Sequence, residues 1–256
     1  MKRLLVPLEA GKISYLAGGK GKNLILLHSL NLSADSWKDI FDSLAQNHAV
    51  YALDMPGHGD SDKPSNNYLI EDYAKSVLQF MDRLPIDRPI VCGNSVGALI
   101  ALEMAASYPR RVEKLILVGC PARDAWERME RFAFSALSFD AQGNPLPLSL
   151  MDLKLTFAHP TPELTNWFNQ QRTKAGVWVK KTVIAISLYD PFPRLPLVKC
   201  PTLVLFGDGD ILREKEKVLL QGIKGAKSSL IKDAGHVPQM EQPKTFLREI
   251  SRFLNS

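Results

Sequence analysis

Eight short apolar runs recur along the chain, and they predict a β-sheet. They cover residues 3–9, 12–17, 23–28, 48–53, 89–93, 114–119, 202–206 and 228–232. Several, such as residues 24–27 (LILL) and 115–118 (LILV), are apolar throughout and do not alternate with polar residues. Strands that are buried on both faces of a mostly parallel sheet have this pattern. We therefore expect eight strands in a mostly parallel sheet.

Helical periodicity fills the intervals between these runs. Apolar residues at positions 37, 40, 41 and 44 share one helix face, and those at 69, 73, 77, 80 and 84 share another. Pro243 suits the first turn of a last helix, whose apolar face carries residues 246, 250, 253 and 254. Strands that alternate with helices predict a doubly wound α/β sheet.

One segment, residues 121–190, interrupts this alternation. It contains no convincing buried strand, but it holds three of the four Trp and five of the eleven Phe. We interpret it as a helical cap between the sixth and seventh strands, above a core of residues 1–120 and 191–256. Most of its aromatic side chains are expected to pack inside the cap. Trp126 and Trp178 are expected to face a cleft between cap and sheet.

Composition excludes several classes of function. Charged residues make up 23% and hydrophobic residues 45% of the chain, as in ordinary globular proteins. The net charge of +5 is spread along the chain, which argues against nucleic-acid binding. No apolar run reaches 18 residues, and the apolar part of the N-terminus is too short for a signal peptide. We expect neither a nucleic-acid nor a membrane partner, and the oligomeric state stays open.

The cysteines and the glycines add two more expectations. Cys92, Cys120 and Cys200 lie in or beside apolar runs, which indicates buried free thiols in a reducing, cytoplasmic compartment. No Cys/His spacing resembles a zinc site, and no glycine-rich nucleotide-binding loop is present. The sequence therefore predicts neither a metal nor an organic cofactor.

The most informative motif is the run Gly93-Asn94-Ser95-Val96-Gly97. It lies between a predicted strand and a predicted helix and has the form G-x-S-x-G. In that context the turn is so sharp that the serine side chain is exposed above the sheet edge. Small residues are needed on both sides, because a side chain there would collide with the neighbouring strand or helix. Ser95 is therefore the candidate nucleophile.

A serine nucleophile needs a base and an acid that orients the base. His236 follows the last predicted strand, and loops at the carboxyl ends of parallel strands line active sites. The acid is expected between Ser95 and His236 in the sequence. Asp210 follows the strand at 202–206 and is the first choice, with Asp208 second and Asp124 a weaker alternative.

A tetrahedral oxyanion needs two backbone N–H donors. Val96 follows the serine and opens a helix whose dipole favours negative charge. The other donor is expected in the loop after the third strand, and Leu30 is our choice for it.

Taken together, these motifs resemble the α/β-hydrolase fold superfamily, in its lid-bearing, esterase-like branch. The resemblance covers residues 24–28, residues 54–62, the Ser95 turn, residues 201–207 and the His236 loop, and it is least clear across 121–190. It implies Ser95 as nucleophile, Asp210 as acid and His236 as base. It also implies structural roles for His28 and His58. The expected activity is hydrolysis of small to medium apolar carboxylic esters, with water and no cofactor, through an acyl-enzyme.

Two departures leave other reactions open. Ser29 stands where the family has a glycine in the oxyanion loop. Asn94 before the nucleophile resembles carbon–carbon bond hydrolases that act on meta-cleavage products, although residues 29–32 do not match their oxyanion loop. The alternatives are such a hydrolase, a lactonase, and a ligand-binding protein on a hydrolase scaffold. The residues expected to line the substrate pocket are Ser29, Asn94, Trp126, Trp178 and Val237.

Overall fold

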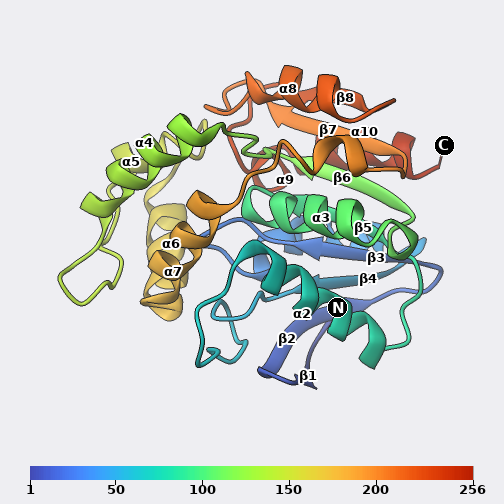
Figure 1. The fold of residues 1–256 in the computed structure, drawn as a ribbon, viewed down its shortest axis with the longest axis horizontal. Coiled ribbons are helices and arrows are strands. Elements are labelled where there is room, and N and C mark those ends of the chain that lie inside the picture. Colours follow the sequence, from blue (N-terminus) through green and yellow to red (C-terminus); the bar gives the residue numbers. More distant parts are fainter. Residues whose placement is uncertain (256) are drawn as a thin grey trace.

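The computed structural model describes residues 1–255, and an eight-stranded sheet forms its centre (Figure 1). The strands are β1 (Lys2–Leu8), β2 (Gly11–Gly18), β3 (Lys22–Leu27), β4 (His48–Leu53), β5 (Ile90–Asn94), β6 (Lys114–Val118), β7 (Thr202–Gly207) and β8 (Lys227–Ile231). Their order is β1-β2-β4-β3-β5-β6-β7-β8. Strand β2 runs antiparallel to β1 and β4, and the other neighbouring pairs are parallel. The predicted eight-stranded, mostly parallel sheet is confirmed.

Two layers of helices explain why the central strands are apolar throughout. In β3, Leu24 and Leu26 belong to one buried cluster, and Ile25 and Leu27 belong to another. Successive side chains of a strand point to opposite faces of the sheet, so each face needs its own apolar residues. Helices α1 (Lys38–Leu44) and α10 (Pro243–Leu254) cover the first cluster, whereas α2 (Ile70–Arg83), α3 (Val96–Ser107) and α8 (Lys215–Gly222) cover the second. The sheet is therefore doubly wound, as predicted.

The segment between β6 and β7 is helical. It contains α4 (Ala125–Ser135), α5 (Leu150–Leu153), α6 (Pro162–Ala175) and α7 (Trp178–Leu188), which lie to one side of the sheet (Figure 1). A buried cluster of Leu153, Phe157 and Phe168 packs against Leu32 and Val237 from the core loops. The division of the chain into core and cap at residues 121 and 190 stays an interpretation. No helix in residues 1–255 has both the length and the apolar character needed to span a bilayer.

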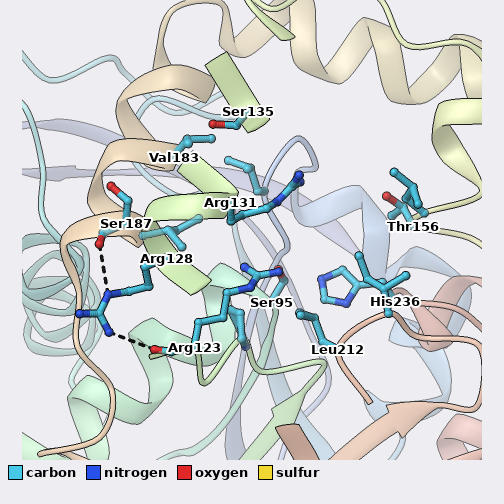
Figure 2. Close-up of a pocket in the computed structure, with 15 residues that line it drawn as sticks. Ser95, Arg123, Arg128, Arg131, Ser135, Thr156, Val183, Ser187, Leu212 and His236 are labelled. Atoms are coloured by element: carbon cyan, nitrogen blue, oxygen red, sulfur yellow. Dashed lines mark hydrogen bonds between the residues drawn. The ribbon is translucent and has the colours of Figure 1, made fainter. Parts of the chain in front are cut away.

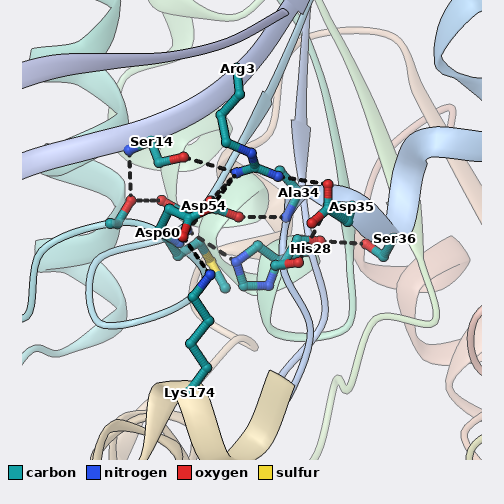
Figure 3. Close-up of polar contacts among 12 residues, drawn as sticks. Arg3, Ser14, His28, Ala34, Asp35, Ser36, Asp54, Asp60 and Lys174 are labelled. Carbon is teal, nitrogen blue, oxygen red and sulfur yellow. Dashed lines mark hydrogen bonds and ion pairs between the residues drawn. The ribbon is translucent and has the colours of Figure 1, made fainter. Parts of the chain in front are cut away.

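A buried carboxylate, that of Asp54, organises the loop after β4 (Figure 3). It accepts hydrogen bonds from the backbone N–H groups of Ala34 (2.7 Å) and Asp60 (3.0 Å), and from the Arg3 guanidinium (2.6 Å). Asp60 in turn pairs with Lys174 of α6. The network therefore links β1, the loop after β4 and the helical segment.

Removing the cation of this network is expected to destabilise the fold. Arg3→Met leaves the buried Asp54 carboxylate without its ion pair, and we expect a loss of about 2 kcal/mol in the free energy of unfolding. The loss is below that of a fully buried pair because the Arg3 side chain is 29% exposed. Urea unfolding measures it. Lys22→Met is the control, since the Lys22–Glu113 pair is exposed and should cost under about 0.5 kcal/mol. Equal losses in the two variants would contradict the role of Asp54.

Candidate active site

Ser95 lies in a sharp turn between β5 and α3. Its backbone has φ 56° and ψ −115°, a conformation that a non-glycine residue adopts only where the surrounding structure imposes it. A Cβ atom on Gly93 would lie 2.0 Å from the Gly97 carbonyl oxygen, and one on Gly97 would lie 2.4 Å from that of Leu27. Both glycines are therefore required sterically, for the reason that the motif suggested.

His236 and Asp210 lie together at the carboxyl ends of neighbouring strands. Asp210 follows β7, and His236 lies in the loop between β8 and α9 (Pro238–Glu241). The His236 Nδ1 atom is 3.1 Å from Asp210 Oδ1 and 3.0 Å from Oδ2. The Asp210 carboxylate is fully buried, and its Oδ1 also accepts from the Leu212 N–H at 2.9 Å. With Nδ1 donating to Asp210, the Nε2 atom of His236 is the nitrogen able to accept a proton.

The other two acids lie elsewhere. Asp208 is exposed, and its Oδ1 accepts from the Ala234 N–H at 3.3 Å. Asp124 caps the N-terminus of α4 by accepting from the Glu127 N–H at 2.9 Å. Within residues 1–255, His236 thus pairs with Asp210 and with neither of these alternatives.

Asn94 anchors the histidine loop. Its Nδ2 donates to the carbonyl oxygens of His236 (2.9 Å) and Val118 (3.2 Å), and its Oδ1 accepts from Gln239 at 3.2 Å. On the other side of the loop, the His236 N–H donates to the Thr156 carbonyl at 2.7 Å. Asn94 therefore ties the backbone of His236 to the end of β5, directly before Ser95.

The two predicted oxyanion donors, the N–H groups of Val96 and Leu30, have no hydrogen-bond partner among residues 1–255. Val96 begins α3, so its N–H has no partner within the helix. Leu30 lines the same pocket as Ser95, and in the described chain its N–H donates to no protein group. The neighbouring Asn31 has φ 68°, and its Oδ1 accepts from Arg172 of α6 at 3.0 Å.

Arg172 was not among the residues predicted from the sequence. Its guanidinium joins Asn31, in the loop after β3, to the Leu146 carbonyl, each at 3.0 Å, and burial lowers its pKa to about 10. No sequence pattern distinguishes this arginine from Lys174, the exposed lysine of α6, because the burial of Arg172 depends on how α6 packs.

His28 and His58 are buried and brace the neighbouring loops. His28 Nδ1 donates to the Ser29 carbonyl at 2.8 Å, and its Nε2 accepts from the Met55 N–H at 3.0 Å. His58 Nδ1 is 3.2 Å from the Pro56 carbonyl. Burial lowers the pKa of His28 to about 4 and that of His58 to about 3. Both therefore remain neutral at neutral pH.

These lowered pKa values predict acid sensitivity of the fold. Between pH 6.5 and 4 the unfolded chain binds protons at His28 and His58 that the folded chain does not. The free energy of unfolding therefore decreases as the pH is lowered. At pH 5 each histidine accounts for a loss of about 2 kcal/mol relative to pH 7. Urea unfolding at pH 7, 6 and 5 should show a smaller acid loss in His58→Gln than in the unchanged protein.

The control for this experiment is His159→Gln. His159 is exposed, and its hydrogen bond with Asp233 raises its pKa, so this pair stabilises the fold at low pH. Removal of this pair should leave the decrease in the free energy of unfolding between pH 7 and pH 5 unchanged or slightly larger. If His58→Gln lost as much free energy of unfolding between pH 7 and pH 5 as the unchanged protein, His58 would not be a source of the acid sensitivity.

A single pocket brings Ser95 and His236 together (Figure 2). Its volume is about 130 Å³, below the roughly 300–1,000 Å³ of common ligand pockets. Its apolar wall includes Leu30, Leu155, Val183, Ile186, Ile211 and Leu212. Three arginines, Arg123, Arg128 and Arg131, also line it. They were not predicted from the sequence, although their close spacing after the sixth strand was a visible signal.

The five residues predicted to line the pocket lie outside it, and that prediction needs correction. Ser29, Asn94 and Val237 are buried and do not line the pocket. Trp178 is also buried, because its ring covers Gly57, where a Cβ would lie 2.3 Å from the ring. Trp126 is 70% exposed on α4. The lining comes instead from the arginines and aliphatic residues named above.

In the part of the chain that the structure describes, no three His, Cys, Asp or Glu side chains converge as a metal site. Cys92 and Cys120 are buried free thiols, as expected, whereas Cys200 is half-buried.

Comparison with known proteins identifies the family. Residues 22–160 match the family model described as the alpha/beta hydrolase fold. A pimeloyl-acyl-carrier-protein methyl ester esterase from Nitrosospira multiformis is 26% identical, over 92% of this chain and 95% of its own. A 2-hydroxy-6-oxo-6-phenylhexa-2,4-dienoate hydrolase from Comamonas testosteroni is 28% identical, over 94% and 91%. The solved enol-lactonase from Burkholderia xenovorans LB400 superimposes with a TM-score of 0.83 at 24% identity, over 99% of this chain and all of that one. The chain therefore belongs to the α/β-hydrolase fold family.

Proposed function

We propose that this hydrolase cleaves small carboxylic esters through Ser95, His236 and Asp210. The observation that carries the proposal is the shared pocket of Ser95 and His236, with the His236 Nδ1 atom held by the buried Asp210. The relative from Nitrosospira multiformis supports it, since its name describes an ester hydrolase. The small pocket favours a substrate of modest size.

The proposed reaction has two halves. In the first, Nε2 of His236 accepts the Ser95 proton as Oγ attacks the ester carbonyl, and the alcohol leaves with that proton. Asp210 holds the imidazole tautomer and stabilises the imidazolium. In the second, His236 activates a water that attacks the acyl-enzyme, and Ser95 regains its proton as the acid leaves.

The N–H groups of Leu30 and Val96 are the proposed oxyanion donors. Each such donor contributes about 3 kcal/mol of transition-state stabilisation in comparable sites. The packing of Asn31 against Arg172 supports this role, because it fixes the loop that carries Leu30.

A serine-directed phosphonate probe tests the proposal. The probe should label Ser95, as identified by mass spectrometry of the digested protein, and prior treatment should abolish hydrolysis of a short-chain aryl ester. Folded protein that carries no label at Ser95 would refute ester hydrolysis at this site and favour a ligand-binding role.

Carbon–carbon bond hydrolysis is the second candidate. The Comamonas testosteroni relative, named for that reaction, and the Asn94 before the serine favour it. Comparing kcat/KM for an aryl ester, a lactone and a vinylogous diketone separates the candidates. We expect the ester to be the fastest substrate, and a much faster diketone would reverse the ranking.

A further inference from the structure

Two arginines of the pocket have guanidinium groups without a hydrogen bond or ion pair among residues 1–255. Arg123 precedes α4, and Arg131 lies within it. Figure 2 draws both around the same space as Ser95 and His236. The Arg131 guanidinium lies 5.5 Å from the centre of the Phe134 ring, a cation–π contact within α4. The third arginine differs, because Arg128 donates to the carbonyls of Ser187 (3.2 Å) and Arg123 (3.0 Å) and pairs with Asp190.

The carboxylates whose charges act on Arg123 already form hydrogen bonds or ion pairs with other residues. Glu127 accepts from the Asp124 N–H and pairs with Lys215. Glu214 also pairs with Lys215, at 3.1 Å, and Asp210 holds His236. Burial lowers the pKa of Arg123, and the positive charge of Arg131 lowers it further. The negative charges of Glu127, Asp210 and Glu214 act on Arg123 in the opposite direction. The pocket therefore holds two neighbouring cations that repel each other, and no carboxylate among residues 1–255 forms an ion pair with either of them.

We propose that Arg123 and Arg131 form an anion subsite, and that the substrate is an ester carrying a free carboxylate. This inference rests on the proposed ester hydrolysis at Ser95. Guanidinium groups bind carboxylates through paired, charge-assisted hydrogen bonds, which are stronger than hydrogen bonds between neutral groups. Arg123 is half-buried and Arg131 is exposed. The aliphatic wall of Leu155, Val183 and Ile186 suits the methylene chain between ester and carboxylate. A half-ester of a short dicarboxylic acid has this chemistry.

Matched esters test the proposal in the full-length protein. For each linear dicarboxylic acid of four to eight carbons, the monomethyl ester carries the anion and the dimethyl ester is its neutral counterpart. The measurements use about 0.15 M salt, which screens long-range attraction. For at least one acid of the series, we expect kcat/KM of the monomethyl ester to exceed that of the dimethyl ester at least tenfold. Arg123→Gln and Arg131→Gln should each lower the monoester value by about 10- to 100-fold and change the diester value by less than about threefold.

The matched control is Arg110→Gln. Arg110 is exposed in the turn Pro109–Arg111, and its replacement removes the same charge away from the pocket, so both ester rates should stay within about twofold. Because neither Arg123 nor Arg131 holds another residue through its guanidinium, the Gln variants should fold, and thermal melting verifies this. A preferred diester, or unchanged monoester rates in both Gln variants, would overturn the anion subsite while leaving ester hydrolysis intact.

A binding measurement separates the two proposals if no ester is cleaved. Calorimetry with adipate should show binding to the unchanged protein that weakens at least tenfold in Arg123→Gln. That result would support the anion subsite even if Ser95 were inert. Absent or unaltered adipate binding would overturn it.

Discussion

Ser95→Ala is expected to lower kcat for the best ester by about 10⁴-fold or more, with little change in stability. The loss is large because without the Ser95 hydroxyl no acyl-enzyme can form, and only substrate binding and the oxyanion donors still accelerate the reaction. Stability should hold because alanine lacks only the hydroxyl group and experiences the same positive φ. Initial rates and urea unfolding of the two proteins measure both effects.

Ser187→Ala is the matched control for this experiment. Ser187 lines the same pocket, but its hydroxyl donates to the Ile184 carbonyl at 2.8 Å, one turn earlier in α7. Its removal should change kcat/KM by less than about threefold. Comparable losses in the two variants, or more than about a percent of activity left in Ser95→Ala, would count against Ser95 as nucleophile.

The sheet was predictable because the physical signal is local. A strand buried between two helical layers must be apolar on both faces, and residues 24–27 and 115–118 satisfy this without interruption. The Ser95 turn was predictable for a similar reason. Only glycine fits at positions 93 and 97, so the two glycines in the sequence directly indicate the sharp turn.

The pairing of His236 with Asp210 was predictable from topology. Both residues follow parallel strands, and parallel strands bring their carboxyl ends to one edge of the sheet. The choice between Asp208 and Asp210 was harder, because the two lie two residues apart in one loop. The structure separates them by burial, since Asp208 is exposed and Asp210 is buried beside Gly119.

The pocket was not predictable, because its lining depends on how helices pack in three dimensions. Trp126 and Trp178 look alike in the sequence, yet one is 70% exposed and the other covers Gly57. Charged residues in or beside a surface helix usually face solvent, so the close spacing of Arg123, Arg128 and Arg131 did not by itself identify them as pocket residues. Asn94 does not line the pocket, because its amide group is buried and bonds to the backbone of His236 and Val118.

Asp210→Asn is expected to lower kcat by about 10³- to 10⁴-fold. The new side chain presents an amide N–H or a weaker acceptor to His236, so the imidazole loses the tautomer that keeps Nε2 free. The imidazolium formed when Ser95 is deprotonated also loses the negative charge that stabilises it. Asp210 Oδ1 already accepts from the Leu212 N–H, so an asparagine oxygen will occupy that position and its amide group will face Nδ1.

The neighbouring acid provides a sharp control, because Asp208→Asn removes the same charge two residues away. Asp208 is exposed, and within residues 1–255 its side chain accepts only from the Ala234 N–H, at 3.3 Å, so kcat should change by less than about threefold. Steady-state kinetics of both variants, with melting temperatures to verify folding, decide between the acids. If Asp208→Asn were the more damaging change, the contact between Asp210 and His236 would be structural, and the acid of the reaction would have to be reassigned. If Asp210→Asn alone loses activity while it melts normally, the buried carboxylate acts on the imidazole and not on the fold.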